Sequence, residues 1–394
     1  MLLKAEDGSK SYVPNQRYQR LFLQSCTITL AICLLCYTYV HLDNYNNHFY
    51  NNFTRWNVRE VIVNTFGLNK SVAASQTSRE RKLVLLWTPY FSEKDWLPST
   101  HDLHCPIQEC DVTSNRSLLP KSSAVILHWR NIDSDDLPRF ITDDSNEIGT
   151  PLVALFNKEA PPNTPIDSLT GINQKIHLTI TYRKDSDVYA PYGRIEKRTK
   201  AFTMPEFKPD RKSVCWLVSH CQTQSKREEY VEILKQYIDV EVFGKCGNHI
   251  CPYEKPLDCY FWLAKQCKFY LSFENSICKD YATEKLYYAL MTDMIPIVMG
   301  GDDYAKYLPP HSFINVANFS SPKNLAKYLH EVSRTQSSYL SYFKWKEKYE
   351  STFVPYWWLC DLCHTLHQTE TKTSMPHPDF SSWWFGESNC AFVE

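Results

Sequence analysis

The sequence predicts an α/β protein in which short buried strands alternate with amphipathic helices. The clearest sign is the stretch 267–301, which has the pattern of a strand, a polar loop, a helix and a second strand. Its strand segments, 269–273 and 295–299, are short apolar and aromatic runs of the kind that fill buried parallel strands. Such a unit places the loop at the carboxyl end of the first strand, where open α/β sheets bind their ligands.

The helix between these two strands is the second sign. Thr283 is placed to cap it, and the apolar residues Leu286, Ala289 and Leu290 follow at helical spacing. The polar residues of the turn therefore precede a helix N-terminus, which attracts anions.

The first half of the chain contains further strand candidates at intervals that suit alternating strands and helices. These apolar runs occupy 82–88, 124–129, 151–156 and 176–182. A polar, proline-containing segment at 200–211 is expected to be a hinge between two α/β domains.

The second half is predicted to open with a strand at 214–218, followed by a helix over 225–238. Ser225 and Glu228 have the spacing of a capping box. The expected buried face of this helix consists of Tyr230, Ile233, Leu234, Tyr237 and Ile238. Later elements are predicted as a strand at 240–243 and closing helices at 323–333 and 339–350.

Composition excludes several classes of protein. The net charge is −1, so no global basic field is present to attract nucleic acid. The chain has only 10 glycines and contains neither the GxGxxG nor the GxxxxGK[ST] motif, so an ordinary dinucleotide fingerprint or phosphate loop is absent.

Residues 21–42 contain no Asp, Glu, Lys or Arg and are long enough to cross a bilayer as a helix. A cleaved signal peptide would also begin with positive charge, but this apolar run starts late and lacks a small-residue exit. We therefore expect an uncleaved signal-anchor, with residues 1–20 in the cytosol, residues 43–80 as a stem, and the remainder in the lumen. This topology is that of a single-pass type II membrane protein, expected in the Golgi.

Two other features fit a lumenal chain. Three of the 15 cysteines lie within 21–42, and the twelve outside it form an even number, as expected for disulfides in an oxidising compartment. The four N-glycosylation sequons begin at Asn52, Asn69, Asn115 and Asn318.

Two cations are placed for binding a diphosphate. Arg227 and Lys285 each fall in the first turn of a predicted helix, beside a strand end. A basic residue is unfavourable against the helix dipole there, so an anionic ligand would explain it. A sugar-nucleotide donor also needs such cations, because charge develops on its leaving diphosphate.

A transferase of this kind needs a carboxylate on the acceptor side. Glu159 lies just past the end of the predicted strand 151–156 and precedes a proline-fixed turn. A carboxylate at this position could take the proton from an attacking sugar hydroxyl.

The segment FYLSFENSICKDYATEKLYYAL (269–290) resembles the donor-binding signature of the α-1,3-fucosyltransferases. VSHCQTQSKREEY (218–230), FNKEAPPNT (156–164) and TYRKDSDVYAPYGRIE (181–196) also resemble runs of that family, and the likeness extends over about 83–365. It implies a GT-B type fold, with two Rossmann-like domains facing each other across a cleft. The expected divisions are an acceptor-side domain at 81–205, a GDP-fucose-binding domain at 206–355 and a Cys- and Trp-containing tail at 356–394.

The resemblance also implies roles for individual residues. Arg227 and Lys285 would hold the diphosphate of GDP-fucose, while Glu284, Tyr281 and Asn275 would position ribose and fucose. Glu159 matches the family's proposed base, although the following Ala160-Pro161-Pro162-Asn163 departs modestly from its pattern. The expected acceptor is the 3-hydroxyl of N-acetylglucosamine in a glycan, and the reaction inverts the anomeric centre.

Other members of the expected site are less determined. His128 and Glu274 are candidates for the cleft, and His128 is equally well explained as a packed residue at a strand end. The family's C-terminal C-x-x-C bridges either locally or back to the first domain. The candidate disulfide cysteines are Cys105, Cys110, Cys360 and Cys363.

Two alternatives compete with a metal-free fucosyltransferase. The Asp-Ser-Asp triplets at 133–135 and 185–187 fit the metal-binding pattern of transferases that use other nucleotide sugars, and 360–367 nominally reads as a haem or zinc motif. A catalytically silent lumenal lectin of the same fold is the other alternative. We expect no essential metal or cofactor, because the two cations can neutralise the diphosphate.

Overall fold

The structure is a computed structural model that describes residues 80–142, 150–169, 171–353, 355–368 and 375–391. Residues from Ser78 onward form one compact unit. The predicted cytoplasmic tail, the signal-anchor, the stem up to residue 79 and the sequons at Asn52 and Asn69 lie outside the described residues. Among the helices that are described, none has the length and apolar character needed to cross a membrane.

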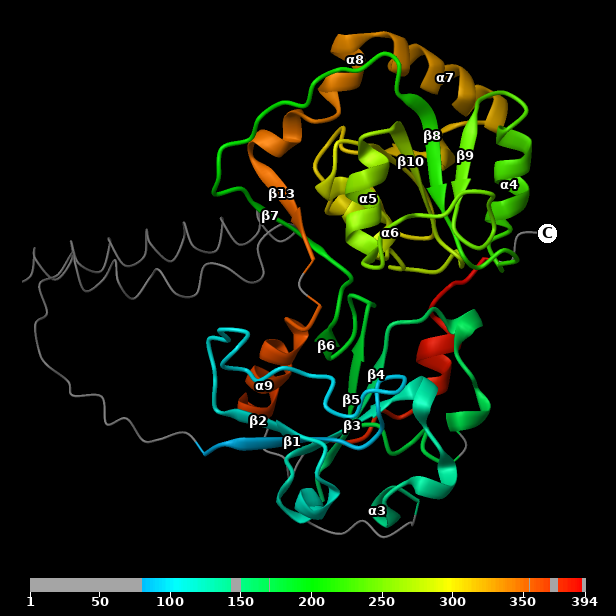
Figure 1. Cartoon of the computed structure of the whole chain (residues 1–394). Helices are drawn as coiled ribbons and strands as arrows, with labels where there is room; N and C mark the ends of the chain where they lie inside the picture. The colour runs from blue at the N-terminus through cyan, green and yellow to red at the C-terminus, as the bar shows by residue number, and fades with distance from the viewer. Residues whose placement is uncertain (1–79, 143–149, 170, 354, 369–374, 392–394) are drawn as a thin grey trace, which may run out of the picture. The chain divides into compact units, whose positions relative to one another are not determined.

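Two parallel sheets organise the chain (Figure 1). The first sheet has the order β2 (Cys110–Thr113), β1 (Lys82–Leu86), β3 (Ala124–His128), β4 (Leu152–Asn157), β5 (Leu178–Thr181), β6 (Val188–Tyr189). The second has the order β12 (Ile314–Asn315), β11 (Ile295–Met299), β10 (Cys267–Phe273), β8 (Lys212–Leu217), β9 (Val240–Phe243). The predicted α/β class with parallel sheets is confirmed.

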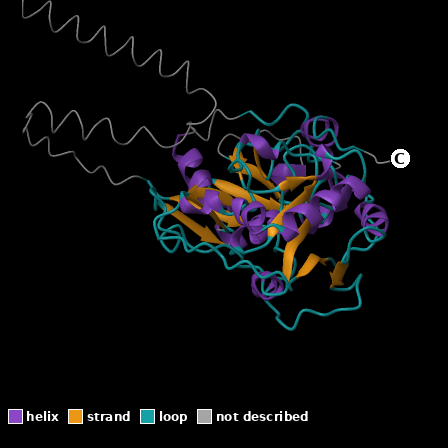
Figure 2. Cartoon of the chain, turned by 90° about the horizontal axis from the view of Figure 1, so that it is seen from above, coloured by secondary structure: helices purple, strands orange, loops and turns teal. Residues whose placement is uncertain are grey.

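Helices surround the strands, as Figure 2 shows. They are α3 (Arg139–Thr142), α4 (Arg227–Leu234), α5 (Pro256–Ala264), α6 (Glu284–Met291), α7 (Pro322–Arg334), α8 (Gln336–Ser341) and α9 (Trp358–Gln368). A small antiparallel pair joins β7 (Arg194–Lys197) to β13 (Tyr349–Thr352).

Both faces of the parallel sheets are buried, which explains their continuous apolar strands. In β10, Phe269, Leu271 and Phe273 face one core, whereas Tyr270 faces the other. The strands predicted at 214–218, 240–243, 269–273 and 295–299 are all present, with ends that move by at most two residues.

The chain returns to the first sheet near its end. Trp358, Leu359, Leu362 and Leu366 of α9 are buried in the core that contains β1 and β3 (Figure 1). Two disulfides, Cys105–Cys360 and Cys110–Cys363, hold this helix to the first sheet. Of the two pairings left open by the sequence, the C-x-x-C therefore bridges back to the first half of the chain.

Every cysteine outside residues 21–42 is paired. The other four bridges are Cys215–Cys267, Cys221–Cys246, Cys251–Cys259 and Cys278–Cys390. The expectation that the even set of twelve forms disulfides is confirmed.

The predicted capping box at Ser225 is wrong. The N-cap of α4 is Lys226, in a left-handed conformation, and Glu228 accepts hydrogen bonds from the backbone and hydroxyl of Thr223 instead. Ser225 donates its hydroxyl to the carbonyl of Glu274 at 2.7 Å. The loop therefore turns back toward β10 before the helix begins, and this tertiary bond displaces the local cap.

Two helix predictions also need correction. The buried face of α4 contains Val231 and Leu234, while Ile233 and Tyr237 are 46% and 40% exposed. The helix ends at Leu234, four residues before the predicted end at 238. Tyr237 and Ile238 therefore lie outside the helix whose periodicity was used to predict them as buried.

The segment 339–350 is not one helix. It contains the end of α8, a 3₁₀ turn and the start of β13. Pairing of β13 with β7 provides backbone partners that the local sequence does not reveal. Some short elements were also missed by the sequence analysis. They are the strands β2, β6 and β12 and the helix α5.

Candidate active site

The carboxyl end of β10 contains a buried charge group. Glu274 is 1% exposed and accepts hydrogen bonds from the backbone and hydroxyl of Thr283 at 2.8 and 2.9 Å. Its other oxygen lies 3.1 Å from Nζ of Lys285. Thr283 occupies the predicted N-cap position of α6, but its hydroxyl bonds Glu274 and makes no cap.

Lys285 is the cation of this group. Its Nζ donates to the hydroxyl of Thr283 at 2.8 Å and to Glu284 at 3.1 Å. Burial lowers the pKa of Lys285, but the two carboxylates outweigh it and raise the pKa overall. The pKa of Glu284 is raised by burial but lowered more by Lys285, so its net change is downward. Glu284 and Lys285 therefore both stay ionised at neutral pH. Burial raises the pKa of Glu274, and Lys285 only partly offsets this.

Arg227 is the first residue of α4 and is 3% exposed. Its guanidinium donates to the carbonyl of Phe273 at 2.6 Å and to that of His220 at 3.2 Å. Its Nε is buried and has no acceptor in the described part of the chain. Burial lowers the pKa of Arg227 because it disfavours the charged guanidinium. An anion bound beside it would stabilise that charge.

Asn275 and Tyr281 belong to the loop between β10 and α6. Within the described residues, the buried Oδ1 of Asn275 has no donor. Tyr281 is 2% exposed, and its ring lies 4.8 Å from that of Tyr182, at the end of β5. The structure therefore brings Arg227, Asn275, Tyr281 and the α6 charge group to one end of β10.

Glu159 follows β4, and its neighbour Asn157 fixes its backbone. The Asn157 side chain accepts from the amide of Glu159 and donates to its carbonyl, both at 3.1 Å. Asn157 is 2% exposed and also donates to Thr164 at 3.2 Å. The main chain at the candidate base is thus held by a buried amide.

The electrostatic environment of Glu159 includes both halves of the chain. Burial raises the pKa of Glu159, while Lys285 and Arg130 lower it. The net change is upward, which favours proton uptake. Because Lys285 lies in the first turn of α6 and Arg130 follows β3, cations from both halves of the chain act on the candidate base.

Lys158 was not predicted as a site residue. Its Nζ donates to the carbonyl of Pro191 at 2.9 Å and lies 4.1 Å from the ring centre of Tyr192. Burial lowers the pKa of Lys158 to about 7, although Glu284 opposes the change. Its position beside Glu159, directly after a buried strand, was the only signal in the sequence.

His128 is packed at the end of β3. It is 4% exposed, its Nδ1 lies 2.7 Å from Oδ1 of Asn131, and its ring is 4.7 Å from that of Tyr90. Burial lowers the pKa of His128, so it stays neutral at pH 7. These contacts support its interpretation as a packed strand-end residue. Tyr90, which sequence reasoning missed, packs against His128, and its pKa is raised by burial first and then by Tyr356, Glu159 and Glu284.

A cavity of about 410 Å³ opens at the carboxyl end of β1. Its lining residues are Leu86, Trp87, Thr88, Pro89, Lys94, Ser114, Asn115 and Arg116. It contains none of the predicted catalytic or donor-binding residues. Asn115 and Asn318, the two described sequon asparagines, are both exposed.

The metal-like motifs have other partners. Asp133 caps a 3₁₀ turn, and Asp185 bonds Arg183 and Lys279. Asp187 accepts from the backbone of Thr179.

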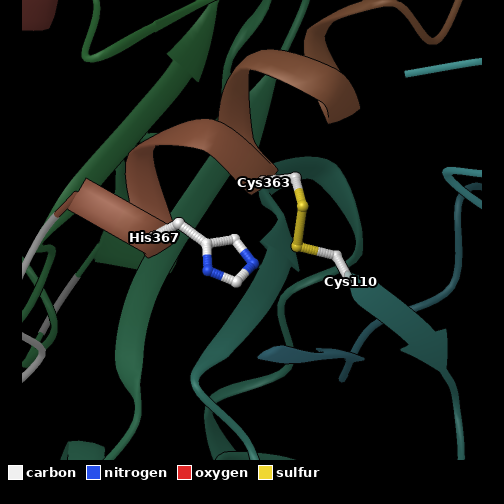
Figure 3. Close-up of side chains that lie close together, drawn as sticks. All are labelled: Cys110, Cys363 and His367. Atoms are coloured by element: carbon white, nitrogen blue, oxygen red, sulfur yellow. A yellow bond between two sulfur atoms is a disulfide. The ribbon is translucent and has the colours of Figure 1, made fainter. Parts of the chain in front are cut away.

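Figure 3 shows the one cluster of ligand-type atoms found in the described chain. It consists of Cys110, Cys363 and His367, but the two sulfurs are bonded to each other. Zinc binds thiolates, which a disulfide does not provide. The ring of His367 faces the carbonyl of Glu109 at 3.2 Å.

Parallel sheets whose strand ends gather a buried arginine, a lysine and a carboxylate can bind an anionic group and take up a proton, as a group-transferring enzyme requires. Comparison with known proteins identifies the family. Residues 79–193 match the fucosyltransferase N-terminal family, and residues 207–383 match glycosyltransferase family 10 (fucosyltransferase), C-terminal part. The chain belongs to this family and is a fucosyltransferase.

Named relatives support the same assignment. The chain is 34% identical over 340 residues to alpha-(1,3)-fucosyltransferase C of Drosophila melanogaster, covering 77% of this chain and 78% of that protein. It is 38% identical over 279 residues to 4-galactosyl-N-acetylglucosaminide 3-alpha-L-fucosyltransferase 9 of Mus musculus, covering 70% and 74%. A crystal structure of an alpha1,3-fucosyltransferase matches with a TM-score of 0.49 and 16% identity, covering 75% of this chain and 92% of the other.

Proposed function

We propose that this chain transfers L-fucose from GDP-β-L-fucose to the 3-hydroxyl of N-acetylglucosamine in glycoprotein glycans, with inversion at the fucose C1. The observation that carries the proposal is the hydrogen bond from Asn163 to Ser276 at 3.2 Å. It joins the turn that follows the carboxylate of Glu159 to the loop before the cation group of α6, and Lys285 is among the charges that act on Glu159. An inverting transfer needs both groups around one reacting carbon.

The donor side would receive GDP-fucose at the end of β10. The buried Nε of Arg227 and Oδ1 of Asn275 have no partner among the described residues, and ligand polar groups would satisfy them. Lys285 stays protonated because Glu274 and Glu284 hold its charge. Arg227 and Lys285 would bind the diphosphate, while Asn275, Tyr281 and Glu284 would contact ribose and fucose.

In the reaction, the carboxylate of Glu159 takes the proton of the acceptor 3-hydroxyl. The acceptor oxygen attacks C1 of fucose from the face opposite GDP, and the bond between C1 and the phosphate oxygen breaks. The electron pair leaves with GDP, whose added negative charge Arg227 and Lys285 stabilise. These cations make an essential divalent metal unnecessary.

The name of one relative supports the proposed acceptor. The mouse protein is named as a 3-fucosyltransferase acting on 4-galactosyl-N-acetylglucosaminide. The two chains share 38% identity over 279 residues, which supports N-acetylglucosamine as the acceptor sugar here.

We also propose that the protein is a single-pass type II protein of the Golgi membrane, anchored by residues 21–42. The six disulfides and the exposed sequon asparagines Asn115 and Asn318 support a lumenal location for the folded part. In sealed microsomes, the folded part should resist added protease unless detergent is present. Digestion without detergent would contradict this topology.

The central test uses the full chain in detergent with labelled GDP-fucose and a panel of glycans ending in N-acetylglucosamine or galactosyl-N-acetylglucosamine. We expect a product with fucose α-linked to the 3-position, identified by NMR, and unchanged turnover in EDTA. Absence of transfer from GDP-fucose to every acceptor would overturn the proposal. Loss of turnover in EDTA would overturn its metal-free mechanism.

A further inference from the structure

The C-terminal segment 375–391 connects the core of the first sheet to the donor loop, residues 274–280. Phe380, Trp383 and Trp384 of this segment are buried with Trp129, which follows β3. The ring of Trp129 lies 5.2 Å from that of Phe380. One end of the segment is therefore anchored by large apolar side chains.

The other end pairs with the backbone of the donor loop. The amide of Ala391 donates to the carbonyl of Ile277, and the amide of Lys279 donates to the carbonyl of Ser388, both at 2.8 Å. Between these bonds, Cys390 forms a disulfide with Cys278, a residue 112 positions away. Three successive positions of the loop are thus tied to the C-terminal segment.

Gln224, in the turn before α4, strengthens this attachment. Its Oε1 accepts from the amide of Ile277 at 3.2 Å, and its Nε2 donates to the carbonyl of Ala391. One side chain therefore bonds both the donor loop and the C-terminal segment. Gln224 also lies three residues before Arg227.

A buried arginine links the segment to the first sheet by polar bonds as well. Arg183 is fully buried and donates to the carbonyl of Trp383 and to the hydroxyl of Ser388. It also pairs with Asp185 at 2.6 Å, and Asp185 accepts from Nζ of Lys279 in the donor loop at 2.9 Å.

Gly301, which follows β11, also packs against the donor loop. A Cβ on Gly301 would lie 2.6 Å from the carbonyl oxygen of Cys278, so only glycine fits against this loop. Ser276 is also held, because its hydroxyl accepts from Asn163 at 3.2 Å. The loop is restrained from several directions, yet Asn275 within it keeps a buried oxygen without a partner in the described structure.

We propose that the C-terminal segment, through the Cys278–Cys390 bridge, is a positioning element that holds the donor loop in its GDP-binding conformation. This inference rests on the proposed function, because it takes the loop to be the GDP-fucose site. Restraining the loop before binding lowers the conformational entropy that the donor would otherwise have to offset. Within the described part of the chain, neither cysteine of the bridge bonds to Glu159, so the effect of the bridge should fall on the donor.

The test compares two double variants of the full chain. In Cys278→Ser/Cys390→Ser the loop loses its covalent attachment, whereas Cys251→Ser/Cys259→Ser removes a bridge that closes only a short loop near α5. We expect the first variant to raise the Kd for GDP and the KM for GDP-fucose about tenfold, with the acceptor KM unchanged. The control should stay within about twofold of wild type. Both variants are measured well below their melting temperatures.

Equal affinity for GDP in the folded Cys278→Ser/Cys390→Ser variant and wild type would overturn the inference. So would equal rises in donor and acceptor KM, or an equal effect in the control. If this variant does not fold, Gln224→Met tests the same attachment with both cysteines present, and unchanged GDP affinity there would overturn it. These outcomes can be told apart from a failure of the proposed function. In that case the wild-type protein itself would neither bind GDP nor transfer fucose.

Discussion

The carboxyl end of β10, the proposed donor end, and the carboxyl end of β4, the proposed acceptor end, handle charge in opposite ways. At the donor end, Glu274, Glu284 and Lys285 form a paired group whose members lie within twelve residues of one another in the sequence. At the acceptor end, the backbone of Glu159 is bonded by Asn157, but no hydrogen bond to its carboxylate occurs in the described part of the chain.

The difference suggests how the two ends would divide the reaction. Paired charges at the donor end keep Lys285 cationic, as stabilisation of a leaving diphosphate requires. An unpaired carboxylate with a raised pKa remains able to accept a proton from the substrate. Substitutions that remove one property and spare the other can break or sharpen this contrast.

The largest effect is expected for Glu159→Gln. It keeps the size of the side chain but removes the base, so kcat should fall by about 10² to 10⁴-fold while the Kd for GDP stays the same. Single-turnover kinetics and calorimetry with GDP measure the two quantities. Unchanged turnover would show that Glu159 is not the base.

Lys285→Ala should affect stability as well as donor binding. It leaves Glu274 buried beside Glu284 without its cation, and the free energy of unfolding should fall by about 3 kcal/mol or more. Binding of GDP should weaken in parallel. The control is Lys306→Ala, which breaks an exposed pair with Asp303 and should change stability by less than about 0.5 kcal/mol. Denaturant unfolding measures both, and equal losses would refute the special role of the buried group.

Asn157→Ala removes the amide that fixes the backbone of Glu159. We expect kcat to fall about 10 to 100-fold because the base is displaced, with the Kd for GDP unaffected. The exposed Asn324→Ala variant is the control. A loss of GDP affinity equal to the loss of kcat would indicate general destabilisation of the site instead.

The smallest effect concerns pH. As the proposed base, Glu159 would act in its carboxylate form, so kcat/KM should fall as pH decreases through its pKa, which burial raises above the ordinary glutamate value. Arg130 lowers this pKa, so Arg130→Gln should move the acid limb of the profile to higher pH. A shift to lower pH, or an acid limb at the ordinary glutamate pKa, would contradict this environment.

Local features of the sequence were sufficient for much of the donor side. Both strands around the donor loop and the start of α6 were predicted, because buried parallel strands and an amphipathic helix have periodic patterns. The family likeness predicted that Arg227 and Lys285 bind the diphosphate together. Their common location follows from parallel strands, whose carboxyl ends share one edge of a sheet.

Other features depend on contacts distant in sequence. Ser225 leaves its predicted cap to bond the carbonyl of Glu274, and Thr283 turns its hydroxyl to the carboxylate of the same residue. Capping rules take account only of neighbours along the chain. A hydrogen-bond partner from a distant segment can therefore replace the predicted cap.

The sequence by itself therefore determined the α/β class, the strands and helix around the donor loop, and the residues suited to carry charge. The tertiary structure alone decided which cysteines pair, how Ser225 bonds the distant carbonyl of Glu274, and how the C-terminal segment reaches the donor loop. The physical reason is the separation along the chain of the residues that interact. Strand and helix patterns arise from local periodicity, whereas a disulfide such as Cys278–Cys390 depends on how two distant segments are brought together by packing.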